Sequence, residues 1–138
     1  MAIQTKQQKR AKFALNKVLE YKKPSKDDAE FHELANFIVG MPNMILSNGL
    51  GQTLAFLLTK KDKQKKTFNI IKEWVQSSEN KFDIQGKSEM EFLTAFSEID
   101  QRKYVDMQDE TLRLMEWLKR YARAFDEKGK EVDYGKGL

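Results

Sequence analysis

The sequence has no cysteine, one histidine and two prolines among its 138 residues. The lack of cysteine excludes disulfide bonds, thiolate zinc sites and cysteine nucleophiles. A single imidazole without companion ligands makes no recognisable metal or acid–base site. We therefore interpret His32, beside Glu33 near the start of an amphipathic segment, as a surface or partly packed residue. We expect no catalytic residue, no metal, no cofactor and no small-molecule substrate.

Long uninterrupted apolar runs are also missing. Residues 34–59 carry no charge, but glycine, proline, asparagine and glutamine interrupt them, whereas a membrane span needs roughly 18 consecutive apolar residues. The first residues are polar and basic, without the apolar core of a secretory signal. We expect a cytoplasmic protein with no membrane-spanning segment, and we interpret residues 34–59 as a buried bend of the core.

The composition favours helices. Hydrophobic residues make up 40% of the chain, charged residues 33%, and there are seven glycines, which suits one helical core better than a turn-dense β protein. We predict an all-α fold, a single-domain bundle of about six to seven helices. We expect one domain over residues 1–127 and a frayed tail over residues 128–138, which contains three glycines.

Helical periodicity predicts the first half of the chain in pieces. Residues 3–22 place Ile3, Ala11, Ala14, Leu15, Val18 and Leu19 on one side of a helix. Pro24 is expected to end this helix and Ser25 to cap the next, whose apolar stripe runs from Phe31 to Val39. Gly40 and Pro42 are expected to break the chain before a short helix that stops at Asn48-Gly49, and residues 50–60 to form another.

The second half is predicted from capping and turn signals. A helix is expected from Asp62 to Ser77, after a junction at residues 60–62 that is either a kink or a turn. Residues 79–87 are expected to form the longest loop. Ser88 and Glu91 have the spacing of a capping box, and a long last helix is predicted over residues 100–127.

Basic residues concentrate near the N-terminus. Residues 1–26 contain eight lysines or arginines and one acid, Glu20, although the whole chain carries a net charge of only +4. Five basic side chains are predicted to lie roughly opposite the Val18 stripe of the first helix, with Phe13 among them: Lys6, Lys9, Arg10, Lys12 and Lys17. Such a face suits phosphates and a stacked base. A solvated helix with Phe13 packed on a neighbour is the equally open alternative.

Two further basic groups are candidates for RNA contact. The first is Lys60, Lys61 and Lys63 at a predicted helix junction, with Lys65 and Lys66 nearby. The second is Arg113, Arg120 and Arg123 on the last helix, beside Lys119, where Glu116 and Glu127 are placed to neutralise it.

Other chemical groups favour structural interpretations. Asp106, Asp109 and Glu110 could gather a hard metal ion, but a solvated helix face is the favoured interpretation. Trp74 and Trp117 lie on apolar stripes and are predicted to be core anchors. Gly49 and Gly51 do not match a phosphate-binding loop, because no Gly-Lys-Ser/Thr follows them.

Several segments together resemble a known family. Pro42, Ile45, the run from Asn48 to Leu57 (NGLGQTLAFL) and Lys60 resemble the signature segment of the small subunit of type III-B (Cmr) CRISPR complexes. Towards the C-terminus, Tyr104, Thr111, Leu114, Trp117-Leu118-Lys119-Arg120 and Ala122 resemble its final helix, and Arg10-Ala11 matches its N-terminal basic helix in placement. The resemblance covers about residues 7–125.

The resemblance implies a helical subunit that stacks on copies of itself and on larger Cmr subunits, beside guide and target RNA, in antiviral defence. It implies no nuclease activity and no catalytic residue. The residues of the motif are interpreted as architecture: Asn48-Gly49 as a turn, Gly51 as a close-packing position, and Gln52 and Thr53 as groups that bond to the bend or to a partner.

Three functional hypotheses follow. The first is a non-catalytic subunit that binds RNA phosphates through basic helix faces while base pairing supplies specificity. The second is a purely structural spacer whose basic faces dock protein subunits. The third, a helix-turn-helix DNA reader, is disfavoured because the helix after Asn48-Gly49 is apolar rather than rich in base-reading side chains.

Overall fold

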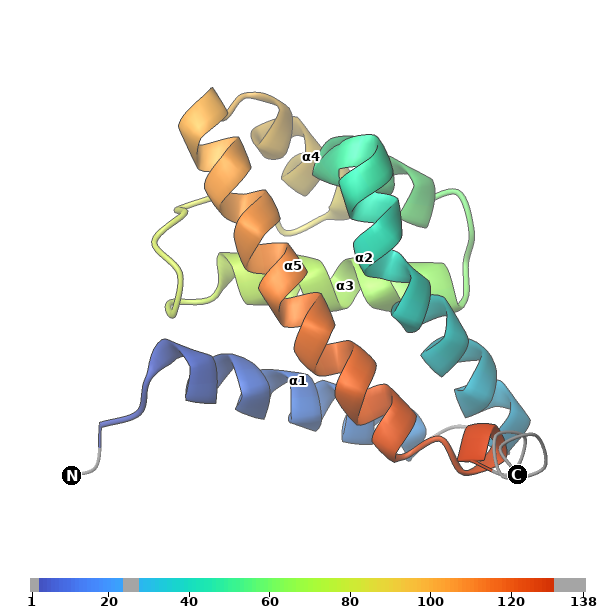
Figure 1. The fold of residues 1–138 in the computed structure, drawn as a ribbon. Helices are drawn as coiled ribbons and strands as arrows, with labels where there is room; N and C mark the ends of the chain where they lie inside the picture. Colours follow the sequence, from blue (N-terminus) through green and yellow to red (C-terminus); the bar gives the residue numbers. More distant parts are fainter. Residues whose placement is uncertain (1–2, 24–27, 131–138) are drawn as a thin grey trace. The chain divides into compact units, whose positions relative to one another are not determined.

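The computed structural model describes residues 3–23 and 28–130. They form five helices in the order α1 (Lys6–Lys22), α2 (Asp28–Leu57), α3 (Lys63–Gln76), α4 (Glu89–Ser97) and α5 (Gln101–Ala124) (Figure 1). Residues 127–130 add one helical turn, and neither described range contains a strand. The predicted all-α class is confirmed. Among the described helices, none has an apolar stretch of the length that a bilayer demands.

The chain divides into two compact units. We call residues up to Met41 and from Leu114 onward the terminal unit, and Pro42–Arg113 the central unit. Both α2 and α5 contribute to both units. The single domain over residues 1–127 stays a prediction. The expected helix end at Pro24, the cap at Ser25 and residues 131–138 of the expected tail lie outside the described residues.

The terminal unit is built from α1, the first part of α2 and the last part of α5. The end of α1 lies beside the end of α5 (Figure 1), where Lys22 Nζ donates to the Phe125 carbonyl at 2.7 Å and lies 4.8 Å from the ring centroid of Phe31. Its core consists of apolar side chains that are at most 5% exposed: Ala14, Val18, Phe31, Leu34, Ala35, Ile38, Met41, Leu114, Met115, Leu118 and Ala122.

The predicted break at Gly40 and Pro42 is wrong, because α2 continues through both residues. Proline inside a helix removes one hydrogen bond and costs about 3 kcal/mol. Ile38, Met41 and Ile45 lie three and four residues apart around this position and are at most 2% exposed, so the helical conformation buries all three on one face. That burial, at roughly 1.5–3 kcal/mol for each side chain, outweighs the loss at Pro42.

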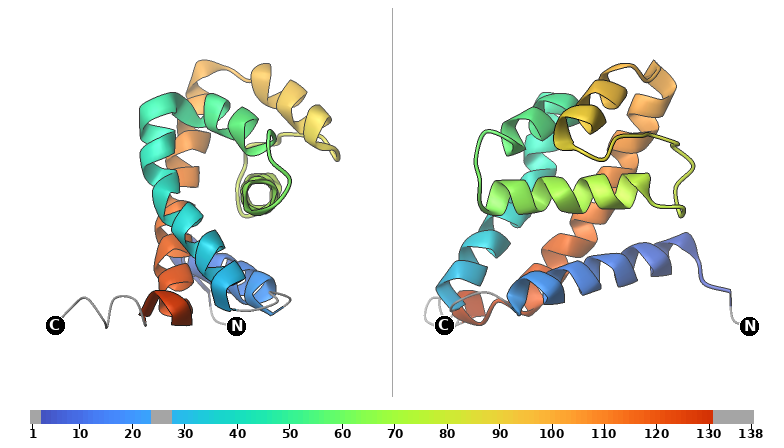
Figure 2. Two further views of the ribbon diagram at one scale, coloured as in Figure 1. Left: turned by 90° about the vertical axis from the view of Figure 1, so that its right-hand side faces the viewer. Right: turned by 180° about the vertical axis from the view of Figure 1, so that it is seen from behind.

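The central unit contains the predicted bend at Gly49, where φ is 84° and ψ is 158° and the helical conformation is interrupted. The segment beyond it ends at Leu57, earlier than the predicted Lys60, and residues 58–62 form a turn rather than a kink. In the left view of Figure 2, α3 is seen along its axis, with α4 and the end of α2 on one side of it. The predicted loop and the Ser88–Glu91 capping box are both present.

Aromatic side chains fill the core of the central unit. The rings of Phe68 and Phe92 meet edge to face at 5.8 Å, and Phe96 lies 6.5 Å from Phe92 and 5.3 Å from Tyr104. Trp74 is 1% exposed, which confirms it as a core anchor. The aliphatic part of this core is Ile45, Leu50, Leu54, Leu57, Ile70, Ile71, Val75, Ile84 and Met107.

Candidate nucleic-acid interface

The basic helix α1 begins at a capping box. Thr5 Oγ1 accepts from the backbone N–H of Gln8 at 3.1 Å, and Gln8 Oε1 accepts from the backbone N–H of Thr5 at 2.8 Å. Both bonds satisfy N–H groups that the first helical turn leaves without intrahelical partners. The cap therefore starts the helix at Lys6, which places all five basic candidates of this segment on regular helix.

Three of these lysines share one face of α1. Lys6, Lys9 and Lys12 are spaced three residues apart, so they occupy neighbouring turns. Lys6 and Lys12 are exposed and Lys9 is partly exposed. This row of ammonium groups is the part of the predicted basic face that is accessible in the structure.

Lys17 and Phe13 form a contact of their own. Lys17 Nζ lies 5.6 Å from the centroid of the Phe13 ring and 3.2 Å from Glu20 Oε2. The Lys17 side chain is only 12% exposed, and Phe13 is partly buried. The lysine therefore stabilises the aromatic ring and an acid on the same helix, and it is less accessible to a ligand than its neighbours are.

Arg10 requires a correction. We predicted that it lies opposite the Val18 stripe, but it is 6% exposed and belongs to the buried side of α1 with Ala14 and Val18. Leu19, expected on the apolar stripe, is instead 42% exposed. The aliphatic stem of an arginine can cover apolar surface as an aliphatic side chain does. The buried face of α1 therefore includes Arg10 instead of Leu19, so it is rotated towards Arg10 relative to the predicted apolar stripe.

The second basic group lies in the central unit. Lys60 and Lys61 are exposed in the turn after α2, and Lys63, the first residue of α3, is partly exposed. The adjacent lysines are paired with acids: Lys65 Nζ lies 3.0 Å from Glu89 Oε1, and Lys66 Nζ lies 3.6 Å from Asp62 Oδ1. These pairs reduce the positive charge of this group.

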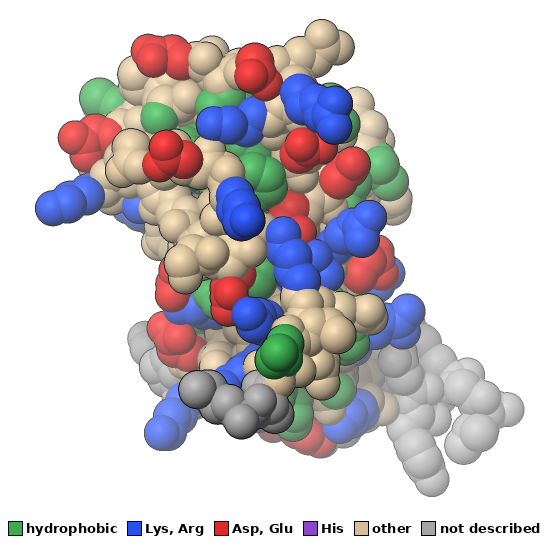
Figure 3. All heavy atoms as spheres, turned by 90° about the vertical axis from the view of Figure 1, so that its left-hand side faces the viewer, with side chains coloured by type: hydrophobic (Ala, Val, Ile, Leu, Met, Phe, Trp, Pro, Cys, Tyr) green, Lys and Arg blue, Asp and Glu red, His purple; other side chains and the backbone are tan. Residues whose placement is uncertain are grey.

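The third group is divided between the units. Arg113 is exposed at the end of the central unit, whereas Arg120 and Arg123 belong to the terminal unit. Arg123 donates to Asn36 Oδ1 at 2.9 Å and lies 3.6 Å from Asp126 Oδ2. Lys119 Nζ is 3.3 Å from Glu116 Oε2, the neutralising pair that we predicted. Figure 3 shows a face on which basic and acidic side chains are mixed.

The Asn48–Thr53 motif forms the bend itself. Beyond Gly49, the backbone N–H of Leu50 donates to Gln108 Oε1 at 2.8 Å and that of Gly51 donates to the Tyr104 hydroxyl at 3.0 Å. Thr53 Oγ1 donates to the Gly49 carbonyl at 2.8 Å, so the predicted bond from Thr53 to the bend is confirmed. Side chains of α5 thus cap the second half of α2.

The other motif residues differ in environment. Asn48 and Gln52 are exposed. A Cβ added to Gly51 would lie 3.5 Å from Phe96 and from the Tyr104 hydroxyl, an ordinary contact distance. Trp117, predicted to be a core anchor, is only partly buried and stacks on Tyr121 at 5.7 Å. We had not identified Gln108; its four-residue spacing from Tyr104 was the available signal.

His32 is partly packed within the terminal unit. Its Nδ1 lies 2.7 Å from Oδ2 of the buried Asp126, and its Nε2 lies 3.1 Å from Asn36 Nδ2. Arg123 can only donate, so its bond to Asn36 Oδ1 leaves Asn36 Nδ2 as the donor to His32 Nε2. The imidazole proton is then on Nδ1, directed at Asp126. Both ring nitrogens have structural partners.

The acidic candidates on α5 are not gathered. Asp106 and Asp109 are exposed, but Glu110 is 6% exposed and accepts the Trp74 indole N–H at 2.9 Å. The prediction that Glu110 lies on a solvated helix face is therefore wrong, because its carboxylate is buried and bonded to the indole. Within residues 3–23 and 28–130, no group of three or more His, Cys, Asp or Glu side chains is placed to hold a metal ion.

A family model for CRISPR-associated proteins of the Cmr5 type matches residues 6–125, which include all five helices. The chain belongs to the Cmr5 family. This is a small-subunit family of type III-B CRISPR systems, as the central motif had indicated. No curated protein matches this Cmr5-family chain significantly. The matched range contains every predicted basic group and the bend at Gly49.

Proposed function

We propose that this Cmr5-family chain is a non-catalytic subunit that contacts guide and target RNA phosphates in a Cmr complex. The observation that carries the proposal is the accessible row of Lys6, Lys9 and Lys12 on α1. The described residues 3–23 contain seven basic residues and one acid, Glu20, and the acid is paired with Lys17. The row lies in this locally basic segment, and basic side chains of this kind suit a phosphate backbone.

Contact through ammonium groups alone carries no base information. A lysine is a point charge with three donors, and it binds any phosphate that comes within reach. In the proposed function, pairing between guide and target supplies the sequence specificity. Lys12 is followed by Phe13, whose ring Lys17 covers on one side, so base stacking is secondary to phosphate contact.

Self-association is supported by exposed apolar side chains in the central unit. Four large ones are accessible: Leu46 at 66%, Met90 at 78%, Val105 at 48% and Phe56 at 39%. Met90, Leu58 and Leu93 also line a groove of about 490 Å³. Exposed apolar side chains and apolar grooves are typical of protein contacts. We propose that the groove at Met90 meets copies of the chain or larger Cmr subunits in a minor filament.

The lysine row of α1 also fits a second candidate function, a spacer that contacts only protein. In that case the lysine row of α1 docks acidic patches of other subunits. Phosphate contact and acidic docking use the same charges, so the two candidates differ in whether the isolated chain binds naked RNA.

The experiment measures binding of unrelated single-stranded RNAs over a range of salt concentrations. Lys6→Ala/Lys9→Ala/Lys12→Ala should weaken all RNAs alike and reduce the slope of log affinity against log salt by about 0.7 for each lost contact. The matched control is Lys65→Ala/Lys119→Ala/Lys130→Ala, which removes the same number of positive charges from positions outside α1.

The control should leave the slope nearly unchanged. If the α1 variant binds RNA as the parent does but no longer joins the assembled complex, the row is a protein-docking surface and the spacer is the correct function.

A further inference from the structure

A chain of hydrogen bonds in the terminal unit links an exposed arginine to a buried carboxylate through the one histidine of the sequence. Arg123 on α5 donates to Asn36 Oδ1 at 2.9 Å, and Asn36 Nδ2 lies 3.1 Å from His32 Nε2, to which it donates. His32 Nδ1 lies 2.7 Å from Oδ2 of Asp126, which is 1% exposed. Side chains of α2, of α5 and of the segment after α5 therefore share one continuous network.

The Asp126 end of this network is fixed. Asp126 Oδ1 accepts from the Gly129 backbone N–H at 2.9 Å, and a Cβ added to Gly129 would clash with the same carboxylate. Arg123 Nη1 lies 3.6 Å from Asp126 Oδ2, which is too long for a hydrogen bond. Asp126 is therefore the hydrogen-bond partner of His32, and Asn36 Oδ1 is the acceptor of Arg123.

The Asn36 side chain is the adaptable member of the network. An amide has one acceptor oxygen and one NH₂ donor, and here the oxygen serves Arg123 while the NH₂ serves the imidazole. Asn36 is exposed, so its amide group turns over without repacking of the core. Its orientation therefore follows from what its two neighbours can donate or accept.

Protonation of the imidazole changes that requirement. A protonated imidazole carries N–H on both ring nitrogens, so Nε2–H and the Asn36 NH₂ would be two donors facing each other. A reversed amide presents Oδ1 to the imidazolium and NH₂ to Arg123, which has no acceptor. Only one of the two cations can then use Oδ1. Asp126 holds His32 in place, whereas the Arg123 side chain is 44% exposed, so Arg123 is the one that leaves.

The charged groups around His32 come from three elements. From α5 and the turn after it, Arg123 and Asp126 are in the network, and from α1 the Lys22 Nζ is bonded to the Phe125 carbonyl at 2.7 Å. The remaining charged neighbours, on α2 and in residues 127–130, are exposed and screened by solvent: Asp28, Glu33, Glu127, Lys128 and Lys130. The network itself therefore decides the response to a proton on His32.

We propose that His32, Asn36 and Arg123 form a pH-dependent switch, in which protonation of the imidazole reverses the Asn36 amide and releases the Arg123 guanidinium. At neutral pH the switch holds Arg123 against α2. In acid the guanidinium is free to bind an anion such as a phosphate. Use of the released arginine for RNA rests on the proposed function, whereas the switch itself does not.

The test is nuclear magnetic resonance of the isotope-labelled full chain from about pH 8 to about pH 5, the interval in which an imidazole ordinarily changes charge. The sequence has one histidine, so the imidazole signals belong to His32. The side-chain signals of Asn36 and Arg123 should shift with the same midpoint as the imidazole, and the guanidinium protons of Arg123 should exchange faster with solvent below it.

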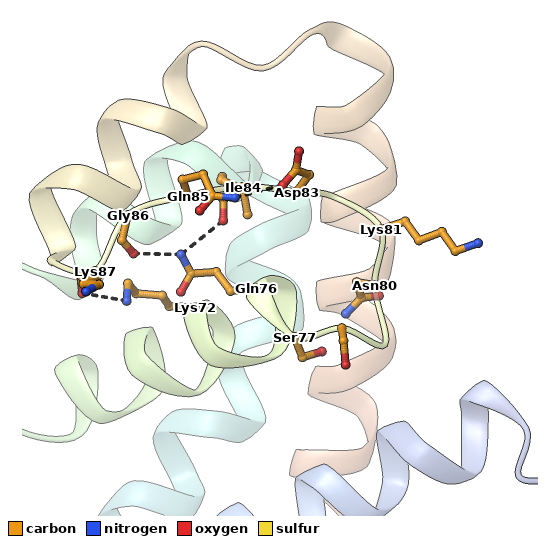
Figure 4. Close-up of a pocket in the computed structure, with 11 residues that line it drawn as sticks. Lys72, Gln76, Ser77, Asn80, Lys81, Asp83, Ile84, Gln85, Gly86 and Lys87 are labelled. Atoms are coloured by element: carbon orange, nitrogen blue, oxygen red, sulfur yellow. Dashed lines mark hydrogen bonds between the residues drawn. The ribbon is translucent and has the colours of Figure 1, made fainter.

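Gln76 in the central unit is an internal control. Its Nε2 donates to the carbonyls of Gly86 at 2.8 Å and Ile84 at 3.3 Å (Figure 4). Backbone carbonyls only accept, so this amide keeps one orientation and its signals should not follow the imidazole. A shift of Gln76 with the same midpoint would show a global change and overturn the proposal.

Two variants separate the switch from a general effect of pH. His32→Gln removes the titrating group, so the Asn36 and Arg123 signals should no longer shift over the interval. Asn36→Asp supplies two acceptor oxygens, so it should bond the imidazolium and Arg123 together and keep Arg123 in place in acid. The matched control Glu33→Gln, at an exposed neighbour, should leave the three signals coupled. The proposal is also overturned if Arg123 in the parent chain is unaffected while the imidazole titrates.

RNA binding tests the use of the released arginine. At about pH 5 the slope of log affinity against log salt for single-stranded RNA should be steeper by about 0.7 than at about pH 8, and Arg123→Gln should lose this increment. A parent chain that binds no RNA at either pH contradicts the proposed function, whereas the resonance measurements decide the switch. An increment that persists in Arg123→Gln shows that the released arginine is not the added contact.

Discussion

The side-chain carbonyl of Gln108 accepts a hydrogen bond from the backbone N–H of Leu50 at 2.8 Å, although the two residues are 58 positions apart. The hydroxyl of Tyr104, one turn earlier on α5, accepts from the backbone N–H of the next residue, Gly51. A helix that restarts after a bend has backbone N–H groups without intrahelical partners. Within the central unit, two side chains of α5 supply what a local cap supplies elsewhere.

Gln108→Ala should lower the free energy of unfolding by about 1–2 kcal/mol, because it leaves the partly buried N–H of Leu50 without its acceptor. Tyr104→Phe, which removes only the hydroxyl, should cost about 1 kcal/mol. The control is Gln52→Ala on the exposed side of the same bend. Denaturant unfolding of the three variants checks this, and a Gln52→Ala effect as large as that of Gln108→Ala would contradict the capping role.

Replacement by alanine should destabilise the protein at Gly49 but have little effect on its stability at Gly51. Gly49 has φ of 84° and ψ of 158°, a conformation that is nearly restricted to glycine, so Gly49→Ala should cost about 1–3 kcal/mol. A Cβ at Gly51 meets neighbours at 3.5 Å, so Gly51→Ala should change stability by less than about 1 kcal/mol. Unfolding transitions of the two variants, measured side by side, test this contrast. Equal losses of stability would contradict the positive φ at Gly49.

His32 should populate the Nδ1–H tautomer. The chain of bonds from Arg123 through Asn36 leaves Nε2 as an acceptor and directs the Nδ1 proton at Asp126. Imidazole ¹⁵N chemical shifts measure the tautomer directly, and a dominant Nε2–H form would contradict this network. Asp126→Ala should cost about 2–3 kcal/mol, since it also removes the acceptor for the Gly129 N–H.

The start of α4 should lose stability in acid. Hydrogen bonds from the backbone and side chain of Ser88, and then from the backbone of Lys87, hold the pKa of Glu91 below its usual value of 4.5. A lowered pKa in the folded state means that the contribution is complete above pH 4.5 and is lost as pH falls through the folded value. Below pH 4.5, the free energy of unfolding of Glu91→Gln should therefore depend less on pH than that of the parent.

Unfolding measured from pH 6 to pH 2 for both chains gives the comparison. The contribution of Glu91 is the difference between their pH dependences. Identical curves over the whole interval would show that the capping carboxylate does not contribute.

Local signals were sufficient for several elements. Ser88 and Glu91 are three residues apart and cap α4 by contacts within one turn, so their spacing alone predicted the start of this helix. Gly49 was identified in the same way, because a left-handed turn depends on the residue itself. The loop at residues 79–87 followed from its polar and glycine content.

Other positions depended on residues far away in the chain. Helical spacing alone does not fix the exact edge of a buried face, so Arg10 was assigned to the basic face. Packing of α1 places it on the buried side instead. Pro42 was expected to end a helix, but its apolar neighbours bury one continuous face. For Gln108 the four-residue spacing from Tyr104 was the available signal, and it could not identify the partner, which is 58 positions away.

The amino-acid sequence by itself determined the all-α class, the family, the bend at Gly49 and the concentration of positive charge in α1. These depend on periodicity, local backbone preference and composition, which act over a few residues. Only the tertiary structure decided that Lys6, Lys9 and Lys12 are accessible while Arg10 is buried, that α5 caps the bend, and that Arg123, Asn36 and His32 form one chain of hydrogen bonds. Such features need side chains from distant segments to meet, and burial and hydrogen bonding choose among arrangements that local propensity leaves equal.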